Sequence, residues 1–120
     1  PHMFLKNGKC VIAGGSPSVS LQENMTQNAI NLLDFGMSIE DAVHKPRFGG
    51  SSMGKPGAII MEPDMPAAII KRLEKSGAKA DIVNPWNWMN GSYDSIYTDP
   101  NTGIAHACGD PRRTAMAIAV

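Results

Sequence analysis

Residues 3–17 read MFLKNGKCVIAGGSP, and this stretch decides the fold. Two short apolar runs, at 3–5 and 10–13, flank the dipeptide Asn7-Gly8. Asn-Gly between strand-like runs is a strong hairpin signal, because a type I′ turn needs positive φ at both central residues. We therefore expect a β-hairpin, which the glycine- and proline-containing run at 14–17 ends.

Helical periodicity follows this hairpin. Apolar residues recur at helical spacing between residues 20 and 35, and they form a single predicted stripe: Leu21, Met25, Ala29, Leu32 and Leu33. Gly36 is suited to end this helix. A second, short helix is expected to begin at Ser38, whose hydroxyl can cap it, and to end before Pro46.

The remaining segments alternate between strands, turns and one more helix. Residues 48–55 are rich in glycine and serine and indicate a loop. A third helix is expected to be capped by Asp64 and closed by Gly77, with a core face of Ile69, Ile70 and Leu73. Strands are expected at 58–61, 80–83, 92–98, 104–108 and 115–120. This order predicts an α+β fold with helices packed on a mostly antiparallel sheet.

Composition narrows the class of protein. The chain has 120 residues and a mass of 12.8 kDa, which is the size of one domain. It is 42% hydrophobic and 18% charged, which excludes a disordered chain. Its formal net charge is zero, which counts against nucleic-acid binding. No apolar run approaches the roughly 20 residues of a membrane span.

The cysteines and histidines do not indicate a metal or redox centre. Cys10 and Cys108 are too few for a disulfide framework, and we expect both to be small buried residues. His2, His44 and His106 are isolated from one another, without metal-ligand spacing. The sequence therefore predicts no metal and no cofactor.

Three motifs, taken in order, resemble the gamma-glutamyltranspeptidase family. Gly14-Gly15-Ser16-Pro17 stands between a hairpin and a long helix, like that family's Gly-Ser-Pro-Gly-Gly segment. Residues 42–48, AVHKPRF, resemble its Ala-Val-x-x-Pro-Arg-Phe signature, and residues 110–113, DPRR, resemble its Asp-Pro-Arg signature. The resemblance covers essentially all 120 residues, but only the C-terminal part of that family's small subunit.

The resemblance implies a fold and a chemistry. The family belongs to the N-terminal nucleophile hydrolases, which have a four-layer αββα sandwich. Its members cleave themselves to expose a Thr, which attacks a gamma-glutamyl amide with its own α-amine as the base. The acyl group then passes to water or to an amino acid, and relatives with the same frame act on acylated cephalosporins or poly-gamma-glutamate.

The family's nucleophile lies upstream of the position that matches Pro1. We therefore expect residues 1–120 to be a C-terminal segment of a larger protein and to be inactive alone. The expected partners are the missing N-terminal part or large subunit, and a small gamma-glutamyl or acyl-amide molecule.

The resemblance also assigns site residues. The family's two glycines after Ser-Pro offer backbone N–H groups to the oxyanion, and here those positions are Ser18 and Val19. Gly15, Ser16 and Pro17 would form the pocket loop. Val is disfavoured where glycine adopts positive φ. The alternative is therefore a non-catalytic structural or interaction module with a degenerate oxyanion loop.

The two family arginines admit two interpretations. Arg47 and Arg112 could bind a substrate carboxylate, since Arg pairs with carboxylates in a bidentate way. They could instead form buried ion pairs that tie loops together, for instance with Asp110. We favour the structural ion pair, because the family's substrate carboxylate is held from upstream.

Two further alternatives remain open. Trp86, Trp88 and Tyr93 could line a pocket, although aromatic clusters more often belong to a core or an interface. The amine of Pro1 could act as a base, as in small tautomerases, although nothing else in the chain resembles those proteins.

Overall fold

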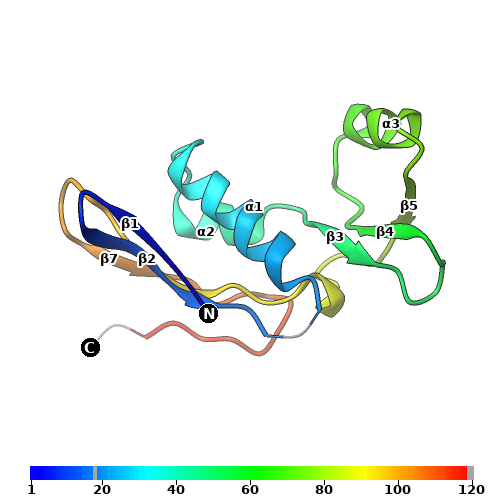
Figure 1. The fold of residues 1–120 in the computed structure, drawn as a ribbon. Helices are drawn as coiled ribbons and strands as arrows, with labels where there is room; N and C mark the ends of the chain where they lie inside the picture. Colours follow the sequence, from blue (N-terminus) through cyan, green and yellow to red (C-terminus); the bar gives the residue numbers. More distant parts are fainter. Residues whose placement is uncertain (18, 119–120) are drawn as a thin grey trace.

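A computed structural model describes residues 1–17 and 19–118 (Figure 1). A first sheet has the strand order β1-β2-β6-β7, and a second sheet has the order β3-β4-β5. The strands are β1 (His2–Lys6), β2 (Lys9–Gly15), β3 (Phe48–Ser51), β4 (Ala58–Met61), β5 (Lys79–Ile82), β6 (Asp94–Thr98) and β7 (Ala105–Ala107). The helices are α1 (Leu21–Leu33), α2 (Ile39–His44), α3 (Ala67–Lys75) and the short 3₁₀ helix η1 (Trp88–Asn90).

The hairpin expected at the start of the chain is confirmed. Asn7 and Gly8 have φ of 52° and 75°, and Lys6 pairs with Lys9 across the turn. Strand β2 then pairs antiparallel with β6, so that Gly15 lies opposite Asp94. The loop that follows β2 is thereby held beside the start of β6.

Helices α1 and α2 pack on one face of the first sheet (Figure 1). The buried core between them consists of Ile12, Ala29, Leu32, Ile39, Ala42, Val43 and Tyr93. The opposite face of the sheet carries exposed apolar side chains, including Met3, Leu5 and Ile96. The expected α+β fold, with helices on a mostly antiparallel sheet, is therefore confirmed.

The buried face of α1 differs from the predicted apolar stripe. Ala29 and Leu32 are buried as expected, but Leu21 is 41% exposed and Leu33 is 42% exposed. Asn24 and Asn28 are each only 1% exposed. The first half of the helix faces polar backbone from other segments, so amide side chains serve better there than apolar ones.

The cap of α2 agrees with the prediction. The Ser38 hydroxyl accepts a hydrogen bond from the backbone N–H of Asp41 at 3.0 Å. The helix ends at His44, two residues before Pro46. This end brings Arg47 into the interior.

The second sheet corrects two expectations. Residues 48–51 form strand β3 rather than a loop, because β4 supplies an antiparallel partner. Strands β4 and β5 are parallel and are connected through α3. Pro66 takes the N-cap position of α3, so Asp64 does not cap it. No residue of α3 is buried, and Ile69 is 47% exposed, because the helix packs on the small second sheet alone.

The last predicted strand is wrong for residues 115–118, which form no strand. Residues 119 and 120 of that prediction lie outside the described residues. The 115–118 segment runs beside Gly109, where an added Cβ would lie 2.4 Å from the Ala115 carbonyl oxygen. Apolar alternation is insufficient for a strand when no neighbouring backbone supplies a ladder.

Cys10 is exposed, so the expectation of two buried cysteines is wrong for this residue; Cys108 is half-buried. Cys10 follows the first residue of β2, close to the hairpin turn and away from the core under the helices. Within residues 1–17 and 19–118, no helix combines the length and apolar character needed to cross a membrane. The same residues bring together no group of His, Cys, Asp and Glu suited to a metal.

Candidate functional site

The loop between β2 and α1 begins in close contact with β6. A Cβ at Gly14 would lie 2.3 Å from both the Asp94 carbonyl oxygen and the Ser95 hydroxyl. Only glycine permits this approach of two backbones. The loop then passes through Ser16 and Pro17; Ser18 lies outside the described residues, and Val19 is 45% exposed.

A second turn, at Gly91 and Ser92, lies against this loop. Gly91 has φ of 73°, which is a left-handed conformation that favours glycine. A Cβ at Gly91 would lie 2.8 Å from the Ser16 hydroxyl and 2.9 Å from the Asn24 amide nitrogen. The two segments are 75 residues apart in the chain, and glycine allows them to touch.

Asn24 connects the loop and the turn. Its Nδ2 group donates to the Ser16 hydroxyl at 2.7 Å and to the Ser92 carbonyl oxygen at 2.9 Å. Its Oδ1 accepts from Nδ2 of Asn28 at 2.8 Å. Three segments are therefore joined through one buried amide.

The other end of the loop is tied to the second sheet. Ser20, at the N-cap of α1, has φ of 57°, and its side chain makes no capping bond. Its hydroxyl instead donates to the carbonyl oxygen of Gly49 at 3.3 Å. The loop is thus attached to β3 where α1 begins.

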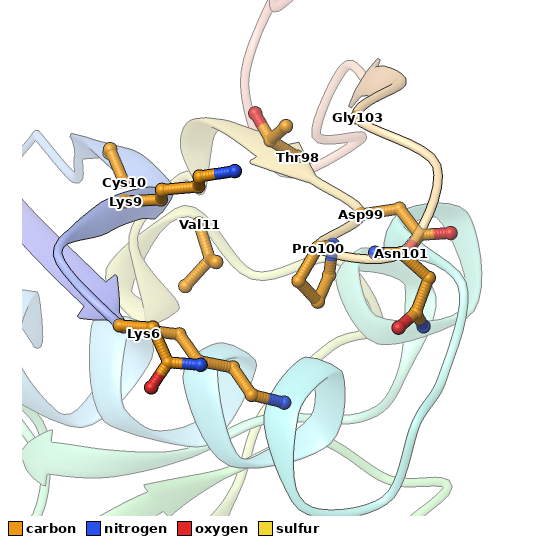
Figure 2. A pocket seen from close by; sticks show the side chains of 10 residues that line it. Lys6, Lys9, Cys10, Val11, Thr98, Asp99, Pro100, Asn101 and Gly103 are labelled. Carbon is orange, nitrogen blue, oxygen red and sulfur yellow. The ribbon is translucent and has the colours of Figure 1, made fainter.

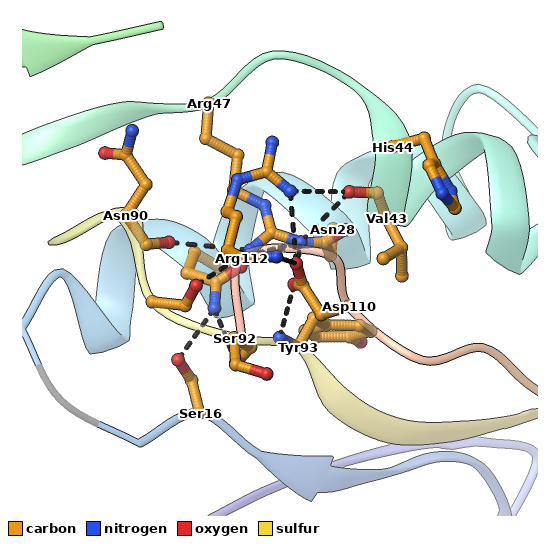
Figure 3. Close-up of polar contacts among 12 residues, drawn as sticks. Ser16, Asn28, Val43, His44, Arg47, Asn90, Ser92, Tyr93, Asp110 and Arg112 are labelled. Carbon is orange, nitrogen blue, oxygen red and sulfur yellow. Dashed lines mark hydrogen bonds and ion pairs between the residues drawn. The ribbon is translucent and has the colours of Figure 1, made fainter. Parts of the chain in front are cut away.

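A buried cluster of four charged residues, Arg47, Glu62, Asp110 and Arg112, lies close to the Gly91 turn. Figure 3 shows three of them, Arg47, Asp110 and Arg112. Nη2 of Arg47 lies 2.6 Å from Oδ2 of Asp110. Arg112 donates from Nε and Nη2 to the two carboxylate oxygens of Glu62, at 2.7 and 2.5 Å, and from Nη1 to Asp110 at 3.3 Å. The cluster holds two cations and two anions, so its formal charge is balanced.

The charged cluster also binds backbone from several segments. Asp110 Oδ2 accepts from the Tyr93 N–H at 2.8 Å, and Arg112 donates to the carbonyl oxygens of Val43 and Lys45 at 2.8 and 2.9 Å. Arg47 Nη1 lies 3.5 Å from the carbonyl oxygens of Asn90 and Gly91. The cluster therefore also contacts the backbone of the Gly91 turn, through Arg47.

Burial, followed by the neighbouring Arg112, lowers the pKa of Arg47 to about 10, although Asp110 and Glu62 act in the opposite direction. Arginine nevertheless keeps its proton at neutral pH. Neither arginine is open to a substrate, since both side chains are at most 3% exposed. Their guanidinium nitrogens contact protein acceptors, apart from Nε of Arg47, which is buried without a partner. This geometry supports the ion-pair interpretation over carboxylate binding.

A hollow of about 330 Å³ lies far from this loop (Figure 2). Lys6, Lys9 and Cys10 line one side of it, and Asp99 and Asn101 line the other. It adjoins the hairpin turn, whereas Ser16 follows the opposite end of β2. Because the seven residues of β2 span about 20 Å, this hollow is separate from the Ser16–Gly91 contact.

The gamma-glutamyltranspeptidase family model matches residues 1–120. This chain belongs to the gamma-glutamyltranspeptidase family. The glutathione hydrolase proenzyme of Escherichia coli (strain K12) is 28% identical over 113 residues, which are 93% of this chain but 18% of that protein. This chain thus spans a minor part of that relative.

Solved structures agree with the family assignment. An acivicin-inhibited gamma-glutamyltranspeptidase, whose C-terminus has critical roles in autoprocessing and catalysis, has a TM-score of 0.76 at 29% identity. The match covers 95% of this chain and 60% of that one. Cephalosporin acylase from Bacillus halodurans shares the fold, with a TM-score of 0.75 at 24% identity and coverage of 92% and 20%. The N-terminal nucleophile hydrolase fold implied by the motifs is thereby confirmed.

Several residues of the three motifs lie close together in the folded chain. Ser16 lies at the Gly91 turn, and Arg47 and Arg112 join Asp110 close to that turn. The Cα of Pro1 lies 3.5 Å from the position that a Cβ at Gly15 would occupy. The N-terminal end of this chain therefore lies beside the pocket loop.

The aromatic residues divide between the core and the surface. Tyr93 is fully buried in the core. Trp86 is half-exposed and stacks on the Arg112 guanidinium at 5.0 Å, and Trp88 stacks on Arg113 at 5.5 Å. Trp86 thus covers one end of the charged cluster rather than lining a pocket at the Ser16 loop.

Sequence reasoning missed several residues of this site: Asn24, Asn28, Glu62, Asn90 and Gly91. Asn24 and Asn28 stand four positions apart on the predicted helix, and this spacing indicates a shared face. Their burial could not be anticipated, because the apolar stripe predicted a different face. Glu62 carries no local signal, since its partner Arg112 is 50 positions away.

Proposed function

We propose that this chain is the C-terminal portion of a gamma-glutamyltranspeptidase-like enzyme that cleaves or transfers gamma-glutamyl or related acyl amides. The nucleophile is an N-terminal Thr that this chain does not contain. The observation that carries the proposal is the contact between the Ser16 loop and the Gly91 turn, to which both Asn24 and the buried Arg47 contribute. The chain is thereby attached at Ser16 and at Ser20, on either side of the proposed donor positions, and oxyanion stabilisation requires backbone N–H groups that are held in place.

The proposed reaction has two steps. The Thr hydroxyl attacks the amide carbonyl carbon, its proton passes to the Thr α-amine, and the negative charge develops on the carbonyl oxygen. The C–N bond then breaks, and the amine leaves with that proton. Water or the amine of an amino acid attacks the resulting ester and releases the Thr. In both steps the N–H groups of Ser18 and Val19 would donate to the oxyanion.

Two features support a partner that completes the fold. The uncovered face of the first sheet carries Met3, Leu5 and Ile96, which are 64%, 63% and 51% exposed. An exposed apolar surface of this kind is typical of an interface. The backbone of Pro1 lies against Gly15, so a preceding segment of the same protein would begin beside the pocket loop. We therefore assign this face to the N-terminal part or large subunit of the same protein.

The test is made on the whole protein, purified from its source or expressed from its complete gene. Intact-mass measurement under native and denaturing conditions should reveal a co-purifying chain that begins with Thr. The assembled protein should release the amine from a chromogenic gamma-glutamyl anilide. Acylated cephalosporins and poly-gamma-glutamate would be tested in parallel as alternative substrates.

A series of variants distinguishes an enzyme whose oxyanion site is weakened from a protein that has lost catalysis. Ser18→Gly with Val19→Gly restores the family's two glycines, and Thr26→Gly on the exposed side of α1 serves as the control for added backbone freedom. A gain in amidase turnover with the loop glycines alone supports an oxyanion role. A correctly processed Thr with no turnover in either form would instead favour the non-catalytic module.

A further inference from the structure

We infer that Asn24 is a positioning residue for acyl transfer, which sets the Ser16 loop against the Gly91 turn. This inference rests on the proposed function and assigns a part of that site to α1. None of the three motifs includes Asn24, whose side chain contacts Ser16, Ser92 and Asn28. It acts by fixing the segment that leads to the proposed oxyanion donors.

The orientation of the Asn24 amide is determined by its partners. The Ser92 carbonyl oxygen can only accept, so the amide nitrogen must face it, at 2.9 Å. The second hydrogen of that nitrogen then points to the Ser16 hydroxyl at 2.7 Å. This orientation leaves Oδ1 to accept from Asn28 at 2.8 Å. Protein groups thus use both donors of the amide and one of the two lone pairs of its oxygen.

These hydrogen bonds are buried, so water cannot replace them when one is lost. Asn24 is 1% exposed, and Ser92 is fully buried. Loss of the amide donor would leave the Ser92 carbonyl without that bond in a place from which water is excluded. The loop and the turn would separate or shift to recover other partners.

The contact also has little room to adjust. A Cβ at Gly91 would lie within 2.9 Å of both the Ser16 hydroxyl and the Asn24 nitrogen. Ser16 is two residues before Ser18, the first of the proposed oxyanion positions. A shift of about 1 Å at Ser16 would therefore reach the donors, and a misplacement of that size can reduce turnover about a hundredfold.

The test compares Asn24→Asp with Asn24→Ala in the whole protein. Asp keeps the shape of Asn but replaces the donor with an acceptor. We expect either variant to lower kcat for a gamma-glutamyl anilide by about tenfold or more, with KM changed less than about threefold. Affinity for a boronic-acid analogue of the gamma-glutamyl group, which forms a tetrahedral adduct, should fall in parallel. Affinity for free glutamate, which forms no adduct, should be retained.

Leu32→Ala is the stability control, because Leu32 is a buried core residue of the same helix. It should lower the melting temperature while keeping kcat within about threefold, since core truncation acts on folding. Ser16→Ala removes only the loop acceptor from a half-buried position and should lower kcat about threefold or more. This variant tests the same bond if the Asn24 variants do not fold.

The outcomes are distinguishable. Absence of turnover in the unaltered protein, with a processed Thr, would overturn the proposed function and this inference together. Normal turnover combined with a wild-type kcat in Ser16→Ala and in any folded Asn24 variant would overturn the inference alone. Equal losses of boronate and glutamate affinity would also overturn it, because they would indicate general damage to the pocket.

Discussion

Arg112 donates hydrogen bonds to both carboxylate oxygens of Glu62, although 50 positions separate the two residues in the chain. The guanidinium and the carboxylate are each at most 4% exposed. Glu62 also accepts from the backbone N–H groups of Arg47 and Asn87, at 3.0 and 3.2 Å. This ion pair thereby connects four segments: the end of β4, the segment after α2, the loop that contains Asn87, and the C-terminal region.

Removal of the Arg112 charge should strongly destabilise the protein. Arg112→Met leaves Glu62 as a buried carboxylate without its main partner, which should lower the free energy of unfolding by about 3–5 kcal/mol. Lys55→Ala breaks the pair with Asp81, but the Lys55 side chain is 63% exposed. This control variant should lower the free energy of unfolding by less than about 1 kcal/mol. Urea denaturation of the whole protein measures both, and equal losses would contradict the role given to the buried cluster.

Gly91→Ala and Gly8→Ala should separate backbone strain from damage to the site. Both glycines have positive φ, of 73° and 75°, so each change strains the backbone. Gly8→Ala should cost about 1–2 kcal/mol, whereas Gly91, with ψ of −172°, lies in a region nearly restricted to glycine, and its change should cost up to about 3 kcal/mol from the backbone alone. Nothing lies within 4 Å of a Cβ at Gly8, whereas a Cβ at Gly91 meets Ser16 and Asn24. Steady-state kinetics with a gamma-glutamyl anilide should show turnover reduced about tenfold or more for Gly91→Ala only. Equal turnover in the two variants would argue against the loop-to-turn contact.

Stability should depend on pH through His2. Burial lowers the pKa of His2 below its ordinary value of 6.5, and its Nε2 lies 3.3 Å from the Tyr93 hydroxyl. Between the lowered pKa of the folded state and 6.5, the unfolded chain binds more protons. Stability should therefore rise with pH through this window and fall as the solution is acidified below 6.5.

The measurement is the urea midpoint between about pH 5 and pH 7.5, for the unaltered protein and for His2→Phe. Phe keeps an aromatic ring against Phe4 and Tyr93 but cannot take up a proton. The variant should lose part of the pH dependence. If the urea midpoint of His2→Phe depends on pH as steeply as that of the unaltered protein, other groups produce the pH dependence.

Ile96→Glu should prevent assembly with the proposed N-terminal part. Ile96 lies on the uncovered face of the first sheet, where a carboxylate would have to be buried in an apolar interface. Thr26→Glu places the same charge on the exposed side of α1 and should assemble normally. Size-exclusion chromatography with mass detection distinguishes the two, and an intact complex with Ile96→Glu would exclude this face as the interface.

Local signals accounted for most of the elements. Asn7-Gly8 predicted the hairpin, and Ser38 predicted the cap of α2, because both depend on neighbours within a few residues. The expectations failed where the outcome depended on distant backbone. Residues 48–51 became a strand through pairing with β4, and residues 115–118 remained outside any strand.

The candidate site was predictable only through motifs. Ser16, Arg47 and Arg112 were identified from three short segments, but the residues that bring those segments together were not. Asn24 lies on a predicted helix, where nothing in the neighbouring sequence indicates burial, and Glu62 stands between the apolar run at 58–61 and a proline. Amide and carboxylate side chains are usually exposed, so their burial here follows from the partners that the fold supplies.

The sequence by itself determined the family, the α+β class and most of the helices and strands, since turn residues, caps and apolar spacing act over a few positions. The tertiary structure alone decided which polar side chains are buried and which face of α1 points inward. It also decided that the Ser16 loop touches the Gly91 turn. Those outcomes depend on groups far apart in the chain, where the need to pair every buried donor and charge selects one arrangement.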